Sequence, residues 1–209
     1  MRIAATVLVV FLLLLVGELW WRKQKLNTEF TRKFVHITVG TFVAFWPFFL
    51  SWQEIRFLSL AFLIVVVISK YLSVFRAIHT VQRPTWGELC FAIAVGAVTF
   101  ITHDKWVYAA ALLQMSLADG FAAVIGTRYG QRFRYIVFGH AKSILGTATF
   151  LIVSAVILAW FSRESGQHLA WTFILDLSVV ASLIENIGVA GLDNLLVPLV
   201  IAGALRFLT

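Results

Sequence analysis

Apolar residues run along this chain in long stretches that are separated by short polar segments. A helix of about 20 apolar residues spans a bilayer, so stretches of this kind predict membrane helices, although several of them are shorter than that. The last stretch is the weakest and is also compatible with a re-entrant segment. The eight stretches are residues 3–21, 34–50, 57–75, 88–101, 106–126, 144–161, 169–184 and 195–208.

The composition supports the same fold class. Of the 209 residues, 61% are hydrophobic and 13% are charged, whereas a soluble domain averages about 25% charged residues. We therefore predict an all-α, polytopic integral membrane protein with about seven or eight transmembrane helices. It forms one domain over residues 1–209, in which 1–33 make the first span and a basic cytoplasmic loop and 34–209 make the catalytic core.

The net charge of +7 does not indicate a nucleic-acid partner, because the basic residues are concentrated in short loops between apolar stretches. Only Arg2, Arg56, Lys105, Arg163 and Arg206 lie outside the first, third and fifth loops. Since positive loops stay in the cytoplasm, both chain ends are predicted outside and residues 185–194 inside. The polar candidates then share one side, so we expect a multi-pass protein of the inner (cytoplasmic) membrane whose active site faces the cytoplasm.

Asp119 is the most informative residue, because it lies inside an apolar stretch. A carboxylate at membrane depth is costly and is usually functional. It predicts a ligand for Mg²⁺, which takes one or two carboxylates together with substrate phosphates. The alternative is a structural pair with a buried cation.

A second group is spaced for one face of a helix: Glu29, Arg32, Lys33 and His36. Arg32 and Lys33 could hold a phosphate. A basic flank that fixes topology and touches anionic lipid has the same pattern, and spacing alone favours that interpretation. Arg83 and Glu88 flank a Pro-Gly turn; a glutamate at a helix start also has a sufficient structural reason in the helix dipole.

Two further segments carry polar residues between apolar stretches. The segment after Asp119 is basic and contains glycines, which suits phosphate groups. Its candidates are Arg128, Arg132, Arg134, Lys142, Gly139 and Gly146. Residues 185–194 hold Glu185, Asn186, Asp193, Asn194 and two glycines. This segment predicts either a broken helix lining a polar cavity with oxygen ligands for Mg²⁺ or an ordinary Asx-rich turn.

In this order, the motifs resemble the CTP-dependent polyprenol kinase family of dolichol kinase, phytol kinase and CTP-dependent diacylglycerol kinase, and most of all its short bacterial members. The matching pieces are Glu29-Phe-Thr-Arg32-Lys33-Phe-Val-His36, Arg83-Pro-Thr-Trp-Gly87-Glu88, Leu117-Ala-Asp119-Gly120, Gly126-Thr-Arg128-Tyr-Gly130, Lys142-Ser143-Ile-Leu-Gly146-Thr147 and residues 185–194.

The resemblance implies γ-phosphoryl transfer from CTP to a membrane lipid alcohol, such as a polyprenol, phytol or diacylglycerol, with a divalent cation. We expect Asp119, Lys142, Asp193 and Glu88 to be catalytic, the last two being candidate bases. The expected metal ligands are Asp119, Glu185, Asp193 and Asn194. The expected nucleotide contacts are Arg32, Lys33, His36, Arg83, Arg128, Gly130, Ser143 and Gly146.

Two rival functions remain at this point. A phosphatidate cytidylyltransferase-like enzyme would use the same substrates, but its K-R-x-x-K-D and D-R-x-D signatures are not found in this sequence. A small ion-coupled transporter would place Asp119 in an ion pathway; transporters often show paired repeats, and none is evident. No P-loop and no G-x-G-x-x-G motif occurs, so neither common soluble nucleotide fold applies.

Overall fold

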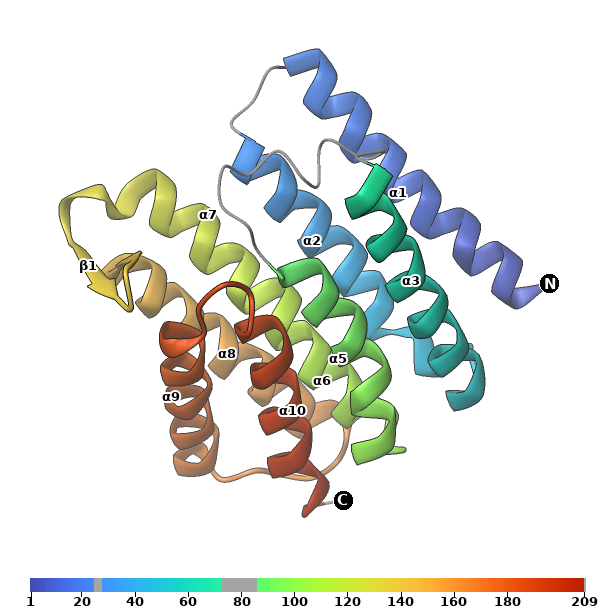
Figure 1. The fold of residues 1–209 in the computed structure, drawn as a ribbon. Coiled ribbons are helices and arrows are strands. Elements are labelled where there is room, and N and C mark those ends of the chain that lie inside the picture. The colour runs from blue at the N-terminus through green and yellow to red at the C-terminus, as the bar shows by residue number, and fades with distance from the viewer. Residues whose placement is uncertain (25–27, 73–85, 209) are drawn as a thin grey trace.

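A computed structural model describes residues 1–24, 28–72 and 86–208, and it shows a bundle of helices with one short β-hairpin (Figure 1). The N-terminal elements are α1 (Arg2–Gln24), α2 (Thr28–Ala44), a short 3-10 turn at Trp46–Phe48, α3 (Trp52–Leu72) and α5 (Gly87–Ile101). The C-terminal elements are α6 (Lys105–Leu113), α7 (Asp119–Tyr129), β1 (Arg134–Val137), β2 (His140–Ser143), α8 (Ile144–Glu164), α9 (Trp171–Ile187) and α10 (Asp193–Arg206).

Each predicted apolar stretch overlaps a helix in the residues that the structure describes, so the all-α prediction holds for most of the described chain. The helix boundaries differ by a few residues, because polar residues at the ends continue the backbone hydrogen bonding beyond the apolar run. Within the described residues, three helices are long and apolar enough to cross a membrane: Arg2–Leu19, Lys105–Arg132 and Ile144–Glu164. The count of seven or eight spans stays a prediction.

The centre of the bundle is α6, whose residues from Val107 to Leu113 are all buried. It continues through a π-helical turn at Gln114–Ala118 into α7. Asp104 caps the start of α6, because its carboxylate accepts hydrogen bonds from the backbone N–H groups of Trp106 and Val107. The central helix is therefore fixed at its first turn and packed on all sides.

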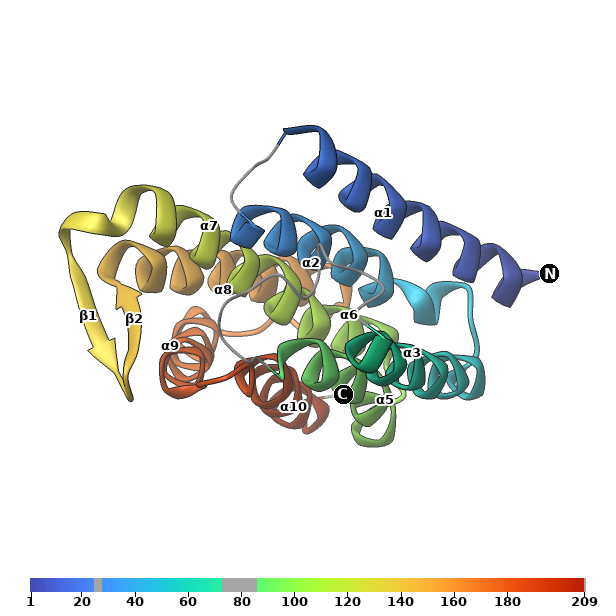
Figure 2. The ribbon, with the colours of Figure 1, turned by 45° about the horizontal axis from the view of Figure 1, so that its top comes forward.

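The outer helices present large apolar side chains to the surroundings. Phe57 is 62% exposed, Phe100 is 70% exposed and Ile152 is 63% exposed. Charged or polar residues normally cover the outer face of a water-soluble bundle, and here that face is apolar. This distribution fits a bundle surrounded by lipid. Figure 2 shows α1 at one edge, alongside α2.

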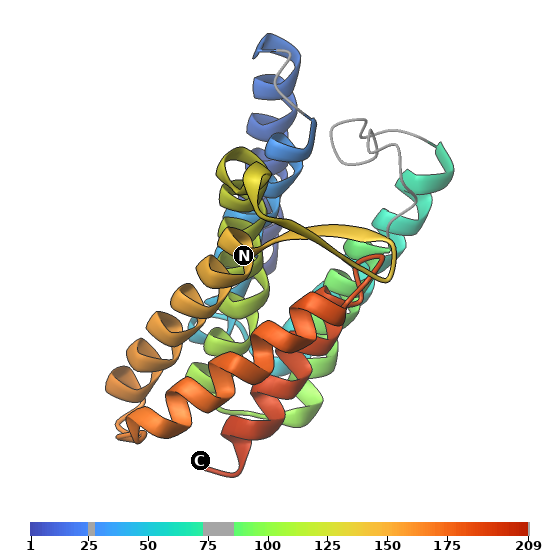
Figure 3. The ribbon, with the colours of Figure 1, turned by 90° about the vertical axis from the view of Figure 1, so that its left-hand side faces the viewer.

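Within residues 1–24, 28–72 and 86–208, the hairpin is the β-structure that departs from an all-helical chain, and the sequence did not predict it. β1 and β2 pair in antiparallel register, with Tyr135 opposite Lys142 and Val137 opposite His140. Phe138 and Gly139 make the turn with positive φ angles of 47° and 78°, as a two-residue hairpin connection requires. Figure 3 shows the hairpin reaching from α7 and α8 toward the turn between α9 and α10.

Candidate active site

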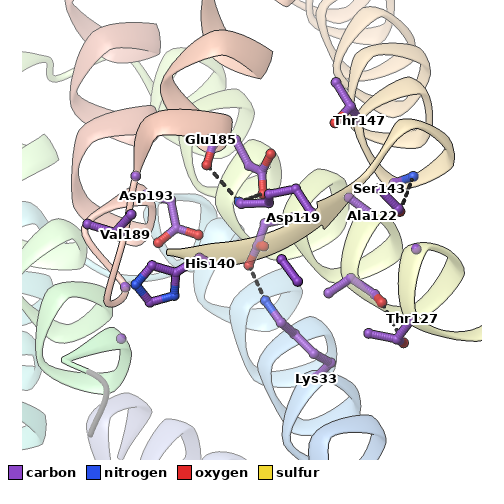
Figure 4. A pocket seen from close by; sticks show the side chains of 18 of the residues that line it. Lys33, Asp119, Ala122, Thr127, His140, Ser143, Thr147, Glu185, Val189 and Asp193 are labelled. Atoms are coloured by element: carbon purple, nitrogen blue, oxygen red, sulfur yellow. Dashed lines mark hydrogen bonds and ion pairs between the residues drawn. The ribbon is translucent and has the colours of Figure 1, made fainter. Parts of the chain in front are cut away.

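A cavity of about 380 Å³ lies where the hairpin, α7 and the turn between α9 and α10 meet (Figure 4). Its walls also include residues from α2, the start of α5 and the first turn of α8. Segments from both halves of the sequence thus enclose one space.

Three carboxylates converge on this cavity from three helices. Asp119 begins α7, Glu185 lies in the last turn of α9, and Asp193 begins α10. One oxygen from each of them can be chosen so that the three lie within 4.8 Å of one another. Asp119 and Glu185 are buried and Asp193 is half-buried. Three negative groups at this separation repel one another unless cations are close by.

Two lysines provide part of that compensation. Lys33 Nζ lies 2.7 Å from Asp119 Oδ2, and both side chains are buried. Lys142 forms an ion pair with Glu185 and also donates a hydrogen bond to the Glu185 backbone carbonyl at 2.9 Å. Burial alone would lower the pKa of Lys142, but the Glu185 carboxylate outweighs it and raises that pKa above its ordinary value. Lys142 therefore carries its positive charge at neutral pH.

A local change in helix geometry precedes Asp119. The π-helical turn at Gln114–Ala118 inserts one extra residue into the ladder, and such turns recur at functional sites. His36 Nε2 donates a hydrogen bond to the Met115 carbonyl in this turn at 2.9 Å, because a carbonyl oxygen can only accept. The same nitrogen lies 3.5 Å from Asp119 Oδ2. α2 therefore contacts both the turn and the carboxylate that follows it.

The turn between α9 and α10 is fixed against the start of α5. Ala190 and Gly191 have positive φ angles of 57° and 94°, and a Cβ on Gly191 would collide with the Gly87 backbone. The Trp86 N–H donates to the Ala190 carbonyl at 2.8 Å, and Asn194 Nδ2 donates to the Gly87 carbonyl at 3.3 Å. These contacts position Asp193 and Asn194, the first two residues of α10.

The hairpin is tied to α8 and α9 by a group of polar side chains. The Tyr135 hydroxyl donates to the Asn186 side-chain oxygen, and the Thr147 hydroxyl donates to the same oxygen at 3.2 Å. Because Tyr135 is paired with Lys142, this anchoring also holds Lys142 over Glu185. Residues that are remote in sequence thereby form one wall of the cavity.

The structure brings many of the predicted site residues to this cavity. The predicted residues that line it are Arg32, Lys33, Asp119, Arg134, Lys142, Ser143, Gly146, Glu185, Asp193 and Asn194. The sequence predicts residues 185–194 as one polar segment, but α9 continues to Ile187 and α10 starts at Asp193. The break is therefore limited to residues 188–192, and Glu185 is presented by a helix.

Other predicted residues do not line the cavity, among them Arg132 and Gly139. Glu88 and His36 line a smaller neighbouring groove. Arg128 is exposed and its guanidinium lies 5.4 Å from the centre of the Tyr129 ring. Gly130 is buried against Ser143. Arg83 and the Glu29 side chain lie outside the described residues.

Ser143 and Gly146 line the cavity and also have structural roles. Ser143 caps α8 by accepting a hydrogen bond at 3.0 Å from the Gly146 N–H. Gly146 packs closely against Gly126 of α7, where a Cβ on Gly126 would lie 3.2 Å from the Gly146 Cα. Both residues bring the start of α8 close to α7. The first turn of α8 consequently faces the cavity, and helix N-termini favour anions.

Sequence reasoning missed His140, Thr127 and Thr147, which also line the cavity. Figure 4 shows His140 on the hairpin beside Asp193 and Val189. The signal for His140 was local: it directly follows Phe138-Gly139, and a glycine between two short runs is typical of a hairpin turn.

The cluster of three carboxylates and its neighbour Asn194 contain buried oxygens that a divalent cation would satisfy. Asp193 Oδ1 and Asn194 Oδ1 are buried and accept no hydrogen bond from any residue that the structure describes. Buried oxygens without a donor are costly, and a hard cation satisfies them, since Mg²⁺ prefers oxygen ligands. Asp119, Glu185, Asp193 and Asn194 therefore fit the ligand set that the sequence predicted, and that assignment remains a proposal.

Comparison with known proteins identifies the family. The chain is 32% identical over 193 residues to the phytol kinase of Synechocystis sp., and the match covers 88% of this chain and 82% of that protein. The chain belongs to the phytol kinase family. The family membership agrees with the resemblance that the motifs indicated.

More distant family members come from plants. The chain is 27% identical to a probable chloroplastic phytol kinase of Triticum aestivum and 25% identical to one of Glycine max. These matches cover 85% of this chain in both cases, but 66% and 64% of the plant proteins, which are longer. No family model matches the chain. No solved structure matches it.

Proposed function

We propose that this chain is a membrane kinase that transfers the γ-phosphoryl group of CTP to the hydroxyl of a long-chain isoprenoid alcohol such as phytol. Its kinase activity and the lipid-alcohol class of its acceptor follow from membership of the phytol kinase family. The nucleotide, the divalent cation and the cytoplasmic orientation are additional proposals that rest on the residues of the cavity.

One observation carries the proposal: three buried or half-buried carboxylates and several basic side chains share one cavity. Asp119, Glu185 and Asp193 supply the negative groups. The basic side chains that line it are Arg32, Lys33, Arg134 and Lys142. Phosphoryl transfer depends mainly on positioning and on neutralising phosphate charge, and a nucleotide with its cation needs both kinds of group.

The residues divide naturally into two roles. Asp119, Glu185, Asp193 and Asn194 would hold the divalent cation. When bound, such a cation neutralises phosphate oxygens and polarises the transferring group. Lys142 and Arg134 lie on the hairpin, next to the first turn of α8, and would bind the phosphate chain. Lys33 and Arg32 approach from α2 on the other side.

The test follows labelled phosphorus from CTP into lipid. Purified protein in detergent or nanodiscs is incubated with γ-labelled or α-labelled CTP, Mg²⁺ and one alcohol at a time: phytol, a long polyprenol or diacylglycerol. We expect label from the γ position in phytol or polyprenol and none from the α position. Label from the α position would instead indicate a cytidylyltransferase. Label in no lipid would contradict the kinase proposal, and replacing CTP with ATP tests the choice of donor.

A further inference from the structure

A second, smaller groove of about 70 Å³ adjoins the charged cavity. It lies between α1, α2, α3 and α5, and it shares three lining residues with the cavity: Arg32, Gly87 and Asn194. The two spaces therefore meet at one junction, where α2, α5 and the start of α10 come together. A molecule in the groove would have one end at the phosphate-binding residues.

The groove is apolar along its length and polar at the junction. Its apolar wall consists of Leu14, Val35, Val39, Phe62 and Phe91. Its remaining lining residues are polar or lie at the junction, and among them are His36 and Glu88. The His36 ring packs edge-on against Phe91, with 5.3 Å between ring centres. This combination suits a molecule with a hydrocarbon body and one hydroxyl group.

The side-chain oxygen of Asn194, which is already a candidate ligand of the divalent cation, also lies at the junction with the groove. Asn194 is 5% exposed, and its Oδ1 has no hydrogen-bond donor within the described part of the chain. Its orientation is fixed, because Nδ2 must face the Gly87 carbonyl to which it donates. A buried acceptor of this kind needs a donor. An amide oxygen has two lone pairs, so a hydroxyl at the junction can donate to Asn194 Oδ1 while a cation also binds it, whereas an apolar molecule cannot.

We infer that this groove is the acceptor site and holds the hydroxyl end of the lipid alcohol, an inference that rests on the proposed kinase function. Its volume is roughly twice the 30 Å³ that one water molecule occupies in liquid. It therefore accepts the hydroxyl and the first few carbons only. The rest of the chain extends between α1 and α3 into the bilayer, along side chains that are already exposed, such as Ile64.

The reaction that this arrangement serves is a balanced transfer. The oxygen of the alcohol forms a bond to the γ-phosphorus, and the bond from that phosphorus to the oxygen shared with the β-phosphate breaks. CDP leaves with that electron pair. The hydroxyl proton passes to Glu88, which is the carboxylate that lines the groove within the described residues. The products are a lipid monophosphate, CDP and one proton.

A matched pair of α1 variants tests whether the acceptor site lies in this groove. Leu14 lines the groove, whereas its neighbour Leu15 is 39% exposed on the same helix. Leu14→Trp narrows the groove and should raise KM for phytol about tenfold, in the range for a misfit of one or two carbons. KM for CTP should change by less than about twofold, and Leu15→Trp should leave both constants near wild type. Equal effects of the two variants on KM for phytol would overturn the location.

Glu88→Gln tests the proton acceptor. It keeps the shape of the side chain and removes its basicity, so kcat should fall by about a hundredfold while KM for phytol changes little. Photocrosslinking of a phytol analogue to the groove, which is described below, should be as efficient in this variant as in the wild type. A folded Glu88→Gln protein with normal kcat would show that Glu88 is not the proton acceptor.

Photocrosslinking of the wild-type protein tests occupancy without any variant. The probe is a phytol analogue with a diazirine on a carbon near the hydroxyl, and the labelled peptides are mapped by mass spectrometry. We expect labels on α2 and α5 around Val35, Val39 and Phe91, which excess phytol removes. Labels confined to α8 or α9, in a preparation that does transfer γ-phosphate, would overturn the acceptor site and leave the kinase function intact. A preparation with no transfer to any alcohol would contradict the kinase function and, with it, the acceptor site.

Discussion

The central helix connects two regions of opposite chemistry. At the start of α6, Trp106 packs edge-on against Phe48 and Trp160, with ring centres 4.8 Å and 5.5 Å apart, and Phe45 packs against Trp160 at 6.0 Å. We call these four residues the aromatic cluster. At the start of α7, the same continuous helix presents Asp119 to the charged cavity.

The difference between these regions indicates what each is for. The aromatic cluster is apolar, and its edge-on contacts stabilise the bundle. The charged cavity contains buried ionised groups and two oxygens without donors in the described chain. Such groups cost stability, so we interpret them as retained for chemistry. Substitutions in the cluster should therefore change stability, and substitutions in the cavity should change turnover.

The largest effect is expected for Asp119→Asn, which keeps the shape of the side chain and removes its charge. Turnover should fall by about a hundredfold or more, as on loss of a major electrostatic contact, measured as γ-label transfer over a range of Mg²⁺ concentrations. Because Lys33 would lose its partner, the double variant Asp119→Asn with Lys33→Met should recover thermal stability without recovering turnover. Near-normal activity of a folded Asp119→Asn protein would disprove the metal role.

A smaller effect on nucleotide use should separate two basic residues that the sequence treats alike. Lys142→Ala removes a charged group from the cavity and should raise KM for CTP about tenfold, which corresponds to about 1.4 kcal/mol. Arg128→Ala is the control, because Arg128 is exposed beside Tyr129 and does not line the cavity. Its KM for CTP should stay within about twofold of wild type. The opposite ranking would contradict the placement of the phosphates beside the hairpin.

Trp106→Leu should act on the other region alone. It removes two edge-on contacts, each worth about 0.5–1.5 kcal/mol, so the free energy of unfolding should fall by about 1–3 kcal/mol. Turnover per folded molecule should not change. Thermal unfolding in detergent measures the first quantity and label transfer the second. Phe57→Leu, at a position that is 62% exposed, serves as the control with little effect on either. A loss of turnover without loss of stability would show that the two regions are not separable.

The orientation of the two regions can be measured with variants that should leave activity almost unchanged. In a Cys90→Ala background, Gln131→Cys lies near the hairpin and Gln53→Cys lies near the start of α3. An impermeant thiol reagent should label position 131 from the cytoplasmic side and position 53 from outside, because the basic loops are concentrated on the first side. Labelling of position 131 from outside only would reject a cytoplasmic active site.

Asp119 shows how much of the site could be predicted from local sequence. A carboxylate within an apolar stretch is conspicuous without any structure. The sequence offered two interpretations of it, a metal ligand and a structural partner of a buried cation. The structure contains the geometry for both, because Asp119 pairs with Lys33 and also lies beside Glu185 and Asp193. The spacing of Lys33 and His36 predicts that they share one helix face, and the structure agrees, because α2 brings both side chains to Asp119.

Glu88 and Arg128 show what spacing along the sequence does not locate. Both are charged and both lie next to motifs that match the family, yet Glu88 lines the small groove and Arg128 lies outside the cavity. His140 was not predicted to contribute, and the hairpin carries it to Asp193 (Figure 4). In each case the position depends on how the hairpin and the α9–α10 turn pack, and sequence spacing contains no measure of that packing.

The sequence by itself determined that this is a helical membrane protein with ionisable groups in an apolar setting. The physical reason is that hydropathy and the need to satisfy every backbone group in lipid act locally, segment by segment. Only the tertiary structure decided which charges meet. Asp119, Glu185 and Asp193 lie within 4.8 Å of one another because a glycine contact between Gly126 and Gly146, a turn locked at Gly191 and an anchored hairpin set the distances between segments.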